Sequence, residues 1–195
     1  MKEKHYANDG SEFIILKTFL KPRKNSSTLN HRMWVVQFTE TGTTMTVYRD
    51  NACKGKLKDP YKRSVYGQGY LGFVDKSKSY YKQANQLWRN MMKRCYSQKD
   101  TKGYYGKAFV DERWKCFSNF LEDLPKLNNF NLWLKGFKSG VKYNLDKDLL
   151  SADNKIYSRD TCQFVTEYEN KSEGAKNGKP YTKKLRVAKE ITNLS

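Results

Sequence analysis

The chain has 195 residues, with 38 Lys and Arg against 20 Asp and Glu, so its formal net charge is +18. A charge of this size favours binding to polyanions, above all nucleic acid. Hydrophobic residues make up 37% and aromatic residues 14% of the chain, which excludes a disordered basic protein and predicts a packed core.

The sequence shows no targeting or membrane segment. The opening residues, MKEKHYANDG, contain no apolar run of the signal-peptide type, and no run elsewhere approaches a membrane span. The cysteines are scattered without any C-x-x-C pair, as in proteins of a reducing compartment. We therefore expect a cytoplasmic protein that does not enter a membrane. A zinc site built from Cys95, Cys116 and Cys162 stays open, although their spacing is not typical of one.

Residues 1–75 are predicted to form a small β-rich, DNA-contacting unit. The runs FIILKTFL, MWVVQF and TTMTVY predict strands, and TETG between the last two predicts a hairpin turn. In the stretch KGKLKDPYKRSVYGQGYLGF, glycines alternate with aromatic residues, without a phosphate-binding pattern. This stretch is either a tightly turned strand that ends the unit or a DNA-contacting β-surface with exposed Tyr and Lys.

Residues 76–172 are predicted to contain a helical segment followed by a ββα module. SYYKQANQLWRNMMKRCY has helical periodicity after a candidate N-cap at Ser79. Its apolar stripe, expected to face the core, consists of Tyr81, Ala84, Trp88, Met91 and Cys95. Its other face carries the candidate DNA contacts Lys82, Arg89, Lys93 and Arg94.

Further along, DERWKCFSNFLEDLP predicts a second helix that ends at Pro125. Residues 126–142 are predicted to be an irregular connection. Residues 173–195 are predicted to form a basic tail that either follows DNA or is simply solvated. The candidate DNA contacts in this tail are Lys183, Lys184 and Arg186.

Residues 146–170 reverse the charge of the chain, with six Asp and Glu against three Lys and Arg. The surrounding stretch, YNLDKDLLSADNKIYSRDTCQFVTEYEN, predicts a strand, a loop, a second strand and a helix that begins with a capping box at Thr166 and Glu169. Asp146 ends the first strand and Asn170 lies in the first turn of the helix, so both can bind one ion. Their hard oxygen atoms suit Mg²⁺ or Mn²⁺.

The same stretch resembles the ββα-metal motif of HNH endonucleases, particularly those of phage-encoded homing-type enzymes. FVTEYEN is similar to the helix entry of the family and places Asn170 on its metal-binding Asn, while Asp146 matches the acid of its leading Asp–His pair. LWRNMMKRCY and YYGKAFVDERWKCFSNFLEDL resemble the segment before the motif, so the resemblance covers roughly residues 80–172. It implies a metal-dependent endonuclease that hydrolyses phosphodiester bonds in duplex DNA, in the cytoplasm of a host cell.

Two positions depart from the family pattern. Lys147 stands where the family has its general-base His, and Thr161 stands where it has a bracing Asn. A lysine is almost fully protonated at pH 7. We therefore expect Lys147 to hold a phosphate oxygen as a cation, with water activated by the metal as the nucleophile. Asp148 is then the nearest candidate to accept the proton.

The sequence thus predicts an α+β fold with an N-terminal β unit, central helices and a C-terminal HNH-like module. The alternative function is a catalytically degenerate HNH-like protein that binds DNA without cutting it, as a regulator or an inhibitor of a host system. In that case Asp146 and Lys147 form only a surface ion pair. An RNA-binding accessory role finds no RNP or KH signature in the chain.

Overall fold

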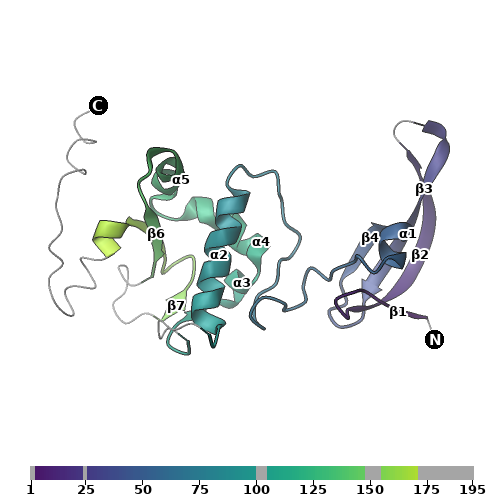
Figure 1. Ribbon diagram of the computed structural model, residues 1–195, viewed down its shortest axis with the longest axis horizontal. Coiled ribbons are helices and arrows are strands. Elements are labelled where there is room, and N and C mark those ends of the chain that lie inside the picture. Colours follow the sequence, from purple (N-terminus) through teal and green to yellow (C-terminus); the bar gives the residue numbers. More distant parts are fainter. Residues whose placement is uncertain (1–2, 24–25, 100–104, 148–154, 171–195) are drawn as a thin grey trace.

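The computed structural model describes residues 3–23, 26–99, 105–147 and 155–170 (Figure 1). These residues form two bodies, each with its own hydrophobic core, one built on an antiparallel sheet and the other on helices and short strands. This mixture is consistent with the predicted α+β class. None of the helices in these ranges combines the length and the apolar character needed to cross a bilayer.

The N-terminal body is a four-stranded antiparallel sheet in the order β1-β2-β3-β4, followed by one short helix. Its elements are β1 (Lys4–Tyr6), β2 (Glu12–Arg23), β3 (Ser26–Phe38), β4 (Thr44–Tyr48) and α1 (Arg49–Cys53). The three strands and the hairpin predicted from the sequence are confirmed. The hairpin turn between β3 and β4 uses Gly42 with φ of 71°, a left-handed conformation that glycine adopts without steric cost.

One face of this sheet forms the core of the N-terminal body. Side chains alternate along a strand, and the register pairs Phe13 with Phe38 and Trp34 with Val47 on the same side. The core also includes Ala52 of α1. The helix therefore covers this side of the sheet, which we call the core face.

Residues 65–74 belong to the second body, and not to the N-terminal unit in which the predicted 1–75 boundary placed them. Val65 is part of the second core, and Leu71 and Val74 pack against it. The chain makes a tight turn in which Val65 and Gly69 form a β-bridge. A Cβ atom on Gly69 would lie 2.9 Å from Met92 Cε, so this packing requires glycine. The predicted tight turn is present, but it belongs to the second body and does not end the N-terminal unit.

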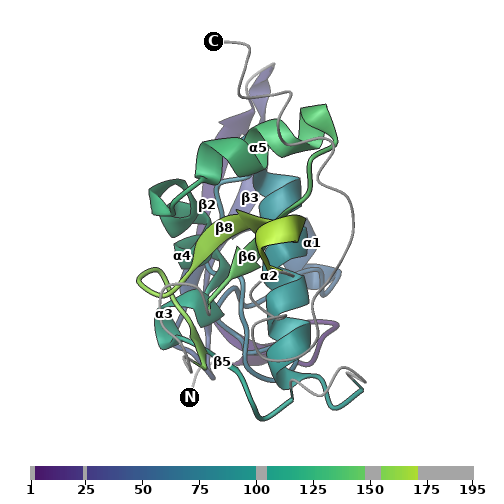
Figure 2. The same cartoon turned by 90° about the vertical axis from the view of Figure 1, so that its left-hand side faces the viewer.

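The second body is built around α2 (Tyr81–Tyr96) (Figure 2). Its other elements are β5 (Phe109–Val110), α3 (Glu112–Lys115), α4 (Phe117–Asp123), η1 (Leu124–Lys126), α5 (Phe130–Ser139), β6 (Tyr143–Asp146), β7 (Ile156–Tyr157) and β8 (Gln163–Thr166). β5 pairs with β7 in parallel, and β6 pairs with β8 antiparallel.

The helix predicted from SYYKQANQLWRNMMKRCY is α2 (Tyr81–Tyr96). Of the predicted apolar stripe, Ala84, Trp88, Met91 and Cys95 are buried and Tyr81 packs against the core, so the prediction of the core face is confirmed. The predicted cap is wrong: the helix begins one residue later than Ser79 would require, with Tyr80 at the N-cap and no side chain that bonds to the first turn.

Residues 126–142 are not the irregular connection that we predicted, because they contain α5. Phe130 and Trp133 are buried one helical turn apart, and the ring of Trp133 stacks on that of Phe164 with 4.8 Å between the centroids. Gly140, with φ of 76°, ends the helix. This aromatic packing holds α5 against the β6–β8 hairpin.

A buried carboxylate fixes the end of α4. Asp123 is 0% exposed, and it accepts hydrogen bonds from Arg113 Nε at 2.8 Å, Lys126 Nζ at 2.9 Å and Trp114 Nε1 at 3.2 Å. Burial alone would raise the pKa of Asp123, but these three donors outweigh it and lower the pKa to about 2. The carboxylate therefore ties α3, α4 and η1 together in its charged form.

We predict that Asp123→Asn lowers the free energy of unfolding by about 2 kcal/mol at pH 7. Because the pKa of this carboxyl is lower in the folded chain than in the unfolded chain, its contribution is complete above about pH 4. This contribution is lost as the pH falls towards 2, where the free energies of unfolding of wild type and variant become equal.

Urea unfolding at pH 7, 5 and 3 measures the difference in free energy of unfolding. Glu122→Gln, which removes an exposed partner of Arg113, is the control and costs about 0.5 kcal/mol or less. A difference between Asp123→Asn and wild type that does not vary with pH would contradict the prediction.

Candidate functional site

The β6–β8 hairpin leads directly into a capped helical turn. The register pairs Tyr143 with Thr166 and Asp146 with Gln163, and residues 167–170 are helical. The backbone N–H of Thr166 donates to Glu169 Oε2 at 2.7 Å, and the backbone N–H of Glu169 donates to Thr166 Oγ1 at 3.2 Å. The predicted capping box is thereby confirmed, and it sets the position of Asn170 in the first turn.

A small polar cleft of about 140 Å³ lies between α2, the β6–β8 hairpin and this helical turn. Asn170 lines it from the helical turn, Asn144 from β6, and Asn90 and Arg94 from α2. The cleft therefore brings three amide side chains and one guanidinium together from segments that are up to 80 residues apart. Such groups supply both oxygen ligands and hydrogen-bond donors to a phosphate.

Asp146 lies on the same strand as Asn144 but further from the helix. Side chains two residues apart point to the same side of a strand, so Asn144 and Asp146 share one face of β6. The antiparallel register places Tyr143, and not Asp146, opposite the residue at which the helix begins. Asn144 is therefore closer to Asn170 along the ladder than Asp146 is. The sequence prediction missed Asn144, and its only signal was the two-residue spacing from Asp146.

Two cationic side chains meet at the Tyr157 ring. Arg94 Nη1 donates to the hydroxyl of Tyr157 at 2.9 Å, and Lys147 Nζ lies 5.8 Å from the centre of its ring. Burial raises the pKa of Tyr157 to about 12, against the opposing effect of the Arg94 guanidinium, so the phenol stays neutral. Aromatic faces attract ammonium groups, and the contact suits Lys147 as a cation held next to Asp146.

The predicted DNA-contacting face of α2 needs one correction. Lys82, Arg89 and Lys93 are exposed and follow one stripe of the helix, since they are seven and four residues apart. Arg94 lies outside this stripe and is half-buried, because it turns towards Tyr157. It therefore belongs to the cleft and not to the outer face of the helix.

The described residues contain no group of three or more His, Cys, Asp and Glu side chains placed to hold a metal ion. The described residues therefore do not form the zinc site that was left open as an alternative: Cys95, Cys116 and Cys162 are buried and form no disulfide. Burial raises the pKa of Cys162 to about 12, which keeps it a thiol. The oxygen donors near the cleft are the amides of Asn144 and Asn170, which line it, and the carboxylate of Asp146, which is on the same strand but is not among its lining residues. Hard oxygen donors of these kinds are the ones that Mg²⁺ takes in proteins.

Several predicted site residues lie outside the described ranges. They are Asp148 of the predicted catalytic group and Lys183, Lys184 and Arg186 of the predicted basic tail.

Thr161, which replaces the bracing Asn of the HNH pattern, braces the loop between β7 and β8 with its hydroxyl. Its Oγ1 donates to the carbonyl of Ile156 at 2.7 Å and accepts from the backbone N–H of Ser158 at 3.0 Å. The two bonds hold the backbone on either side of Tyr157. The threonine therefore holds Tyr157 in place beneath Arg94 and Lys147.

We predict that Thr161→Val lowers the free energy of unfolding by about 1–2 kcal/mol, because it leaves the Ser158 N–H and the Ile156 carbonyl without this partner. Thr161→Ser keeps the hydroxyl and should stay within about 0.5 kcal/mol of wild type. Denaturant unfolding of the three proteins measures the effect. Equal stability of Thr161→Val and wild type would show that the hydroxyl does not brace the loop.

Comparisons of the chain with protein-family models, with curated proteins and with solved structures found no match. The likeness to HNH endonucleases therefore depends on the motif residues of this chain. The function is argued below from the geometry of the cleft.

Proposed function

We propose that this protein is a metal-dependent endonuclease of HNH type that acts on duplex DNA. The observation that carries the proposal is the β6–β8 hairpin, which leads through a capping box to Asn170 in a cleft shared with Asn144 and Arg94. A phosphodiester hydrolase of this type needs a hairpin and a helix that present oxygen ligands and cations to one phosphate. The hairpin, the helical turn and α2 supply side chains of both kinds.

Asp146 and Asn170 would hold Mg²⁺ or Mn²⁺, with Asn144 as a further oxygen donor. Mg²⁺ in phosphoryl-transfer sites is often held by only one or two carboxylates, together with water and phosphate oxygens, so this small donor set fits it. A divalent cation supplies charge neutralisation at the phosphate and activation of water. In this proposal the chain orients the ligands through the hairpin register and the capping box.

The cations of the site would stabilise the negative charge of the reacting phosphodiester. Lys147 lies beside Asp146 and over the Tyr157 ring, and Arg94 reaches the same tyrosine from α2. Neutral Tyr157 fixes both side chains without cancelling their charge. Asp148 is the candidate proton acceptor by its place in the sequence.

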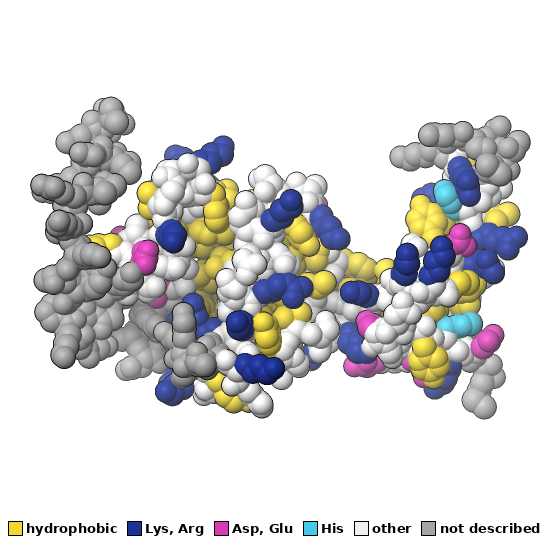
Figure 3. Space-filling model, in the orientation of Figure 1, with side chains coloured by type: hydrophobic (Ala, Val, Ile, Leu, Met, Phe, Trp, Pro, Cys, Tyr) yellow, Lys and Arg dark blue, Asp and Glu magenta, His cyan; other side chains and the backbone are white. Residues whose placement is uncertain are grey.

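Phosphate contacts away from the cleft would come from the exposed α2 stripe of Lys82, Arg89 and Lys93. Lysines and arginines that face solvent neutralise DNA phosphates and release counterions, so the affinity should fall steeply with salt. In Figure 3, Lys and Arg side chains are spread over both bodies on the face in view. The tail residues Lys183, Lys184 and Arg186 would add further contacts of the same kind.

The second candidate is an HNH-like protein that binds DNA without cutting it. It is favoured by the lack of a metal-holding group of His, Cys, Asp and Glu in the described residues. It is also favoured by the sequence, in which both histidines, His5 and His31, precede the second body. In this candidate the cleft and the α2 stripe would bind the sugar-phosphate backbone only.

One assay distinguishes the two candidate functions. Purified protein is incubated with supercoiled plasmid and Mg²⁺ or Mn²⁺, with EDTA as the control, and nicked or linear product is measured. We expect cleavage that EDTA abolishes. DNA binding, followed by mobility shift, should survive EDTA because the basic side chains act without a metal. Binding without any cleavage under either metal would support the second candidate.

We predict that Asp146→Ala and Asn170→Ala each reduce cleavage at least 100-fold while DNA affinity changes less than threefold, because they remove metal ligands and not phosphate contacts. The matched control is Asn119→Ala, an amide on α4 that is not part of the cleft. If Asp146→Ala cuts as well as wild type, the hairpin is not the active site.

Lys147→His tests the departure from the family pattern. An imidazole has a pKa near 6.5 and is a good base at neutral pH, so cleavage should hold or rise if the site keeps the geometry of the family. An inactive wild type that gains cleavage on this change would identify a decayed nuclease. A dead Lys147→His variant of an active wild type would show that the lysine has a role of its own.

A further inference from the structure

The β2–β3 pair extends well beyond the N-terminal core as a two-stranded arm (Figure 1). β4 pairs only with residues 33–37 of β3. Beyond that point β2 and β3 pair only with each other, from Leu20–Arg32 to Arg23–Ser26. A ribbon of two strands has no core of its own, so its length is not explained by the stability of the sheet.

The side of the sheet opposite the core face is not covered by any described helix. We call it the open face, and the register assigns to it Lys17, Phe19, Lys21, His31 and Tyr48. The buried hydrophobic residues that form the N-terminal core do not include any of these residues. Because α1 packs on the other side, only the open face is accessible along the whole length of the sheet and the arm.

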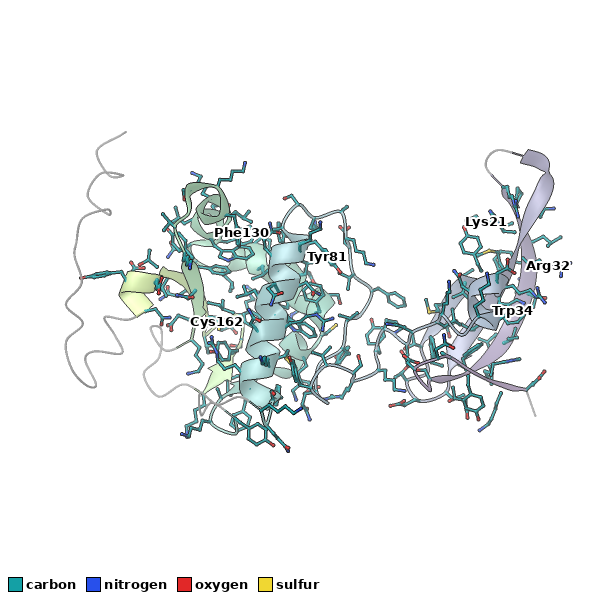
Figure 4. All side chains as sticks on the ribbon, in the orientation of Figure 1. Lys21, Arg32, Trp34, Tyr81, Phe130 and Cys162 are labelled. Atoms are coloured by element: carbon teal, nitrogen blue, oxygen red, sulfur yellow. The ribbon has the colours of Figure 1, made fainter. Side chains whose placement is uncertain are left out.

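All the charged side chains of β2 and β3 between residues 13 and 38, and of the residues that join them, are basic. Residues 13–38 contain five Lys and Arg and no Asp or Glu. Among the described residues, Lys17 and Lys21 form no ion pair, and neither does Arg32 on the opposite side of the arm; Figure 4 labels Lys21 and Arg32. A carboxylate at the base of the open face, Glu12, is already bound by Lys4 and Tyr6.

Aromatic side chains lie between these cations. Phe19 is 38% exposed and Tyr48 is 44% exposed, and His31 packs edge-on against Tyr48 with 4.9 Å between the ring centroids. An exposed aromatic surface with cations around it that form no ion pair is complementary to a ligand that has negative charges and, between them, apolar groups such as thymine methyls.

We infer that the β2–β3 arm, together with the adjoining part of the open face, docks into the major groove of duplex DNA. The major groove of B-DNA is about 12 Å wide and admits a two-stranded β-ribbon. Lys17 and Lys21 then reach the phosphates on either side, while Phe19 and Tyr48 face the base edges. The inference rests on the proposed DNA partner but not on the proposed cleavage.

The first test removes two charges from the arm and compares this with the removal of two charges elsewhere. Lys17→Gln/Lys21→Gln is the arm variant, and Lys54→Gln/Lys56→Gln, at exposed positions next to α1, is its matched control. Fluorescence anisotropy with a random-sequence duplex of 30 base pairs gives Kd from 50 to 200 mM salt, and circular dichroism verifies folding. The arm variant should lose affinity at least tenfold and lower the salt slope by about 1.8, since each phosphate contact contributes about 0.9. The control should stay within threefold of wild type. Equal losses in both variants, or no loss in the arm variant, would overturn the inference.

The second test asks which groove is used. One duplex carries glucosylated 5-hydroxymethylcytosine, which fills the major groove, and another is A-form RNA, whose major groove is too narrow for side chains to read. Wild type should bind both at least tenfold more weakly than unmodified DNA, and the arm variant should discriminate much less. Undiminished binding of wild type to glucosylated DNA would exclude the major groove.

The two proposals fail in different ways. The arm variant should still nick plasmid at saturating protein concentration if the protein is a nuclease, because the arm and the cleft lie on different bodies. If wild type binds but never cuts, the proposed function fails and the arm is still tested by affinity. If wild type binds no duplex DNA at all, both proposals are overturned.

Discussion

The packing of Trp88 holds together the body that contains the candidate site. Trp88 is 0% exposed, and its indole Nε1 donates to the carbonyl of Trp114 at 2.7 Å. Gly69, in the tight turn of residues 65–74, packs against the same ring. The ring centroid of Phe117, in α4, lies 5.3 Å from that of Trp88. One buried side chain thus joins α2 to three other segments. Because Asn90 and Arg94 follow Trp88 on the same helix, their position at the cleft depends on this packing.

The parts of the fold that were predicted correctly are those with a strong local signal. The 3.6-residue period of α2 and the β-branched runs of the N-terminal sheet both depend on residues close in sequence. α5 was missed because asparagines before it and Gly140 after it suggested a loop, although Phe130, Trp133 and Phe137 have helical spacing. The arm was missed for a different reason. Neither face of its described residues packs against a core, so its sequence lacks the alternation of apolar and polar residues that indicates a strand.

In the candidate site, too, the features with a local sequence signal were predicted and those that depend on distant residues were not. The capping box at Thr166 and Glu169 is local and was predicted. The hydrogen bond between Arg94 and Tyr157 was not predicted, because the two residues are 63 positions apart in the sequence. A helical pattern does not show which cation of the helix contacts a distant tyrosine. Asn144 was missed because asparagine is common on surfaces, and only the register of β6 against β8 places it at the cleft with Asn170.

The segment that contains Asp146 and the strands of the arm differ in the sign of their net charge. The sequence of residues 146–170 contains six Asp and Glu, whereas the sequence of residues 13–38 contains none. In the proposed function a divalent cation is therefore needed to bring a phosphate to Asp146, while the arm and the α2 stripe attract DNA without one. Binding and cleavage are then separate requirements, met by separate surfaces of the chain. On these two proposals, a chain without the metal ligands would still bind DNA through the arm, so a nuclease of this architecture could become a DNA-binding protein without any change in the N-terminal sheet.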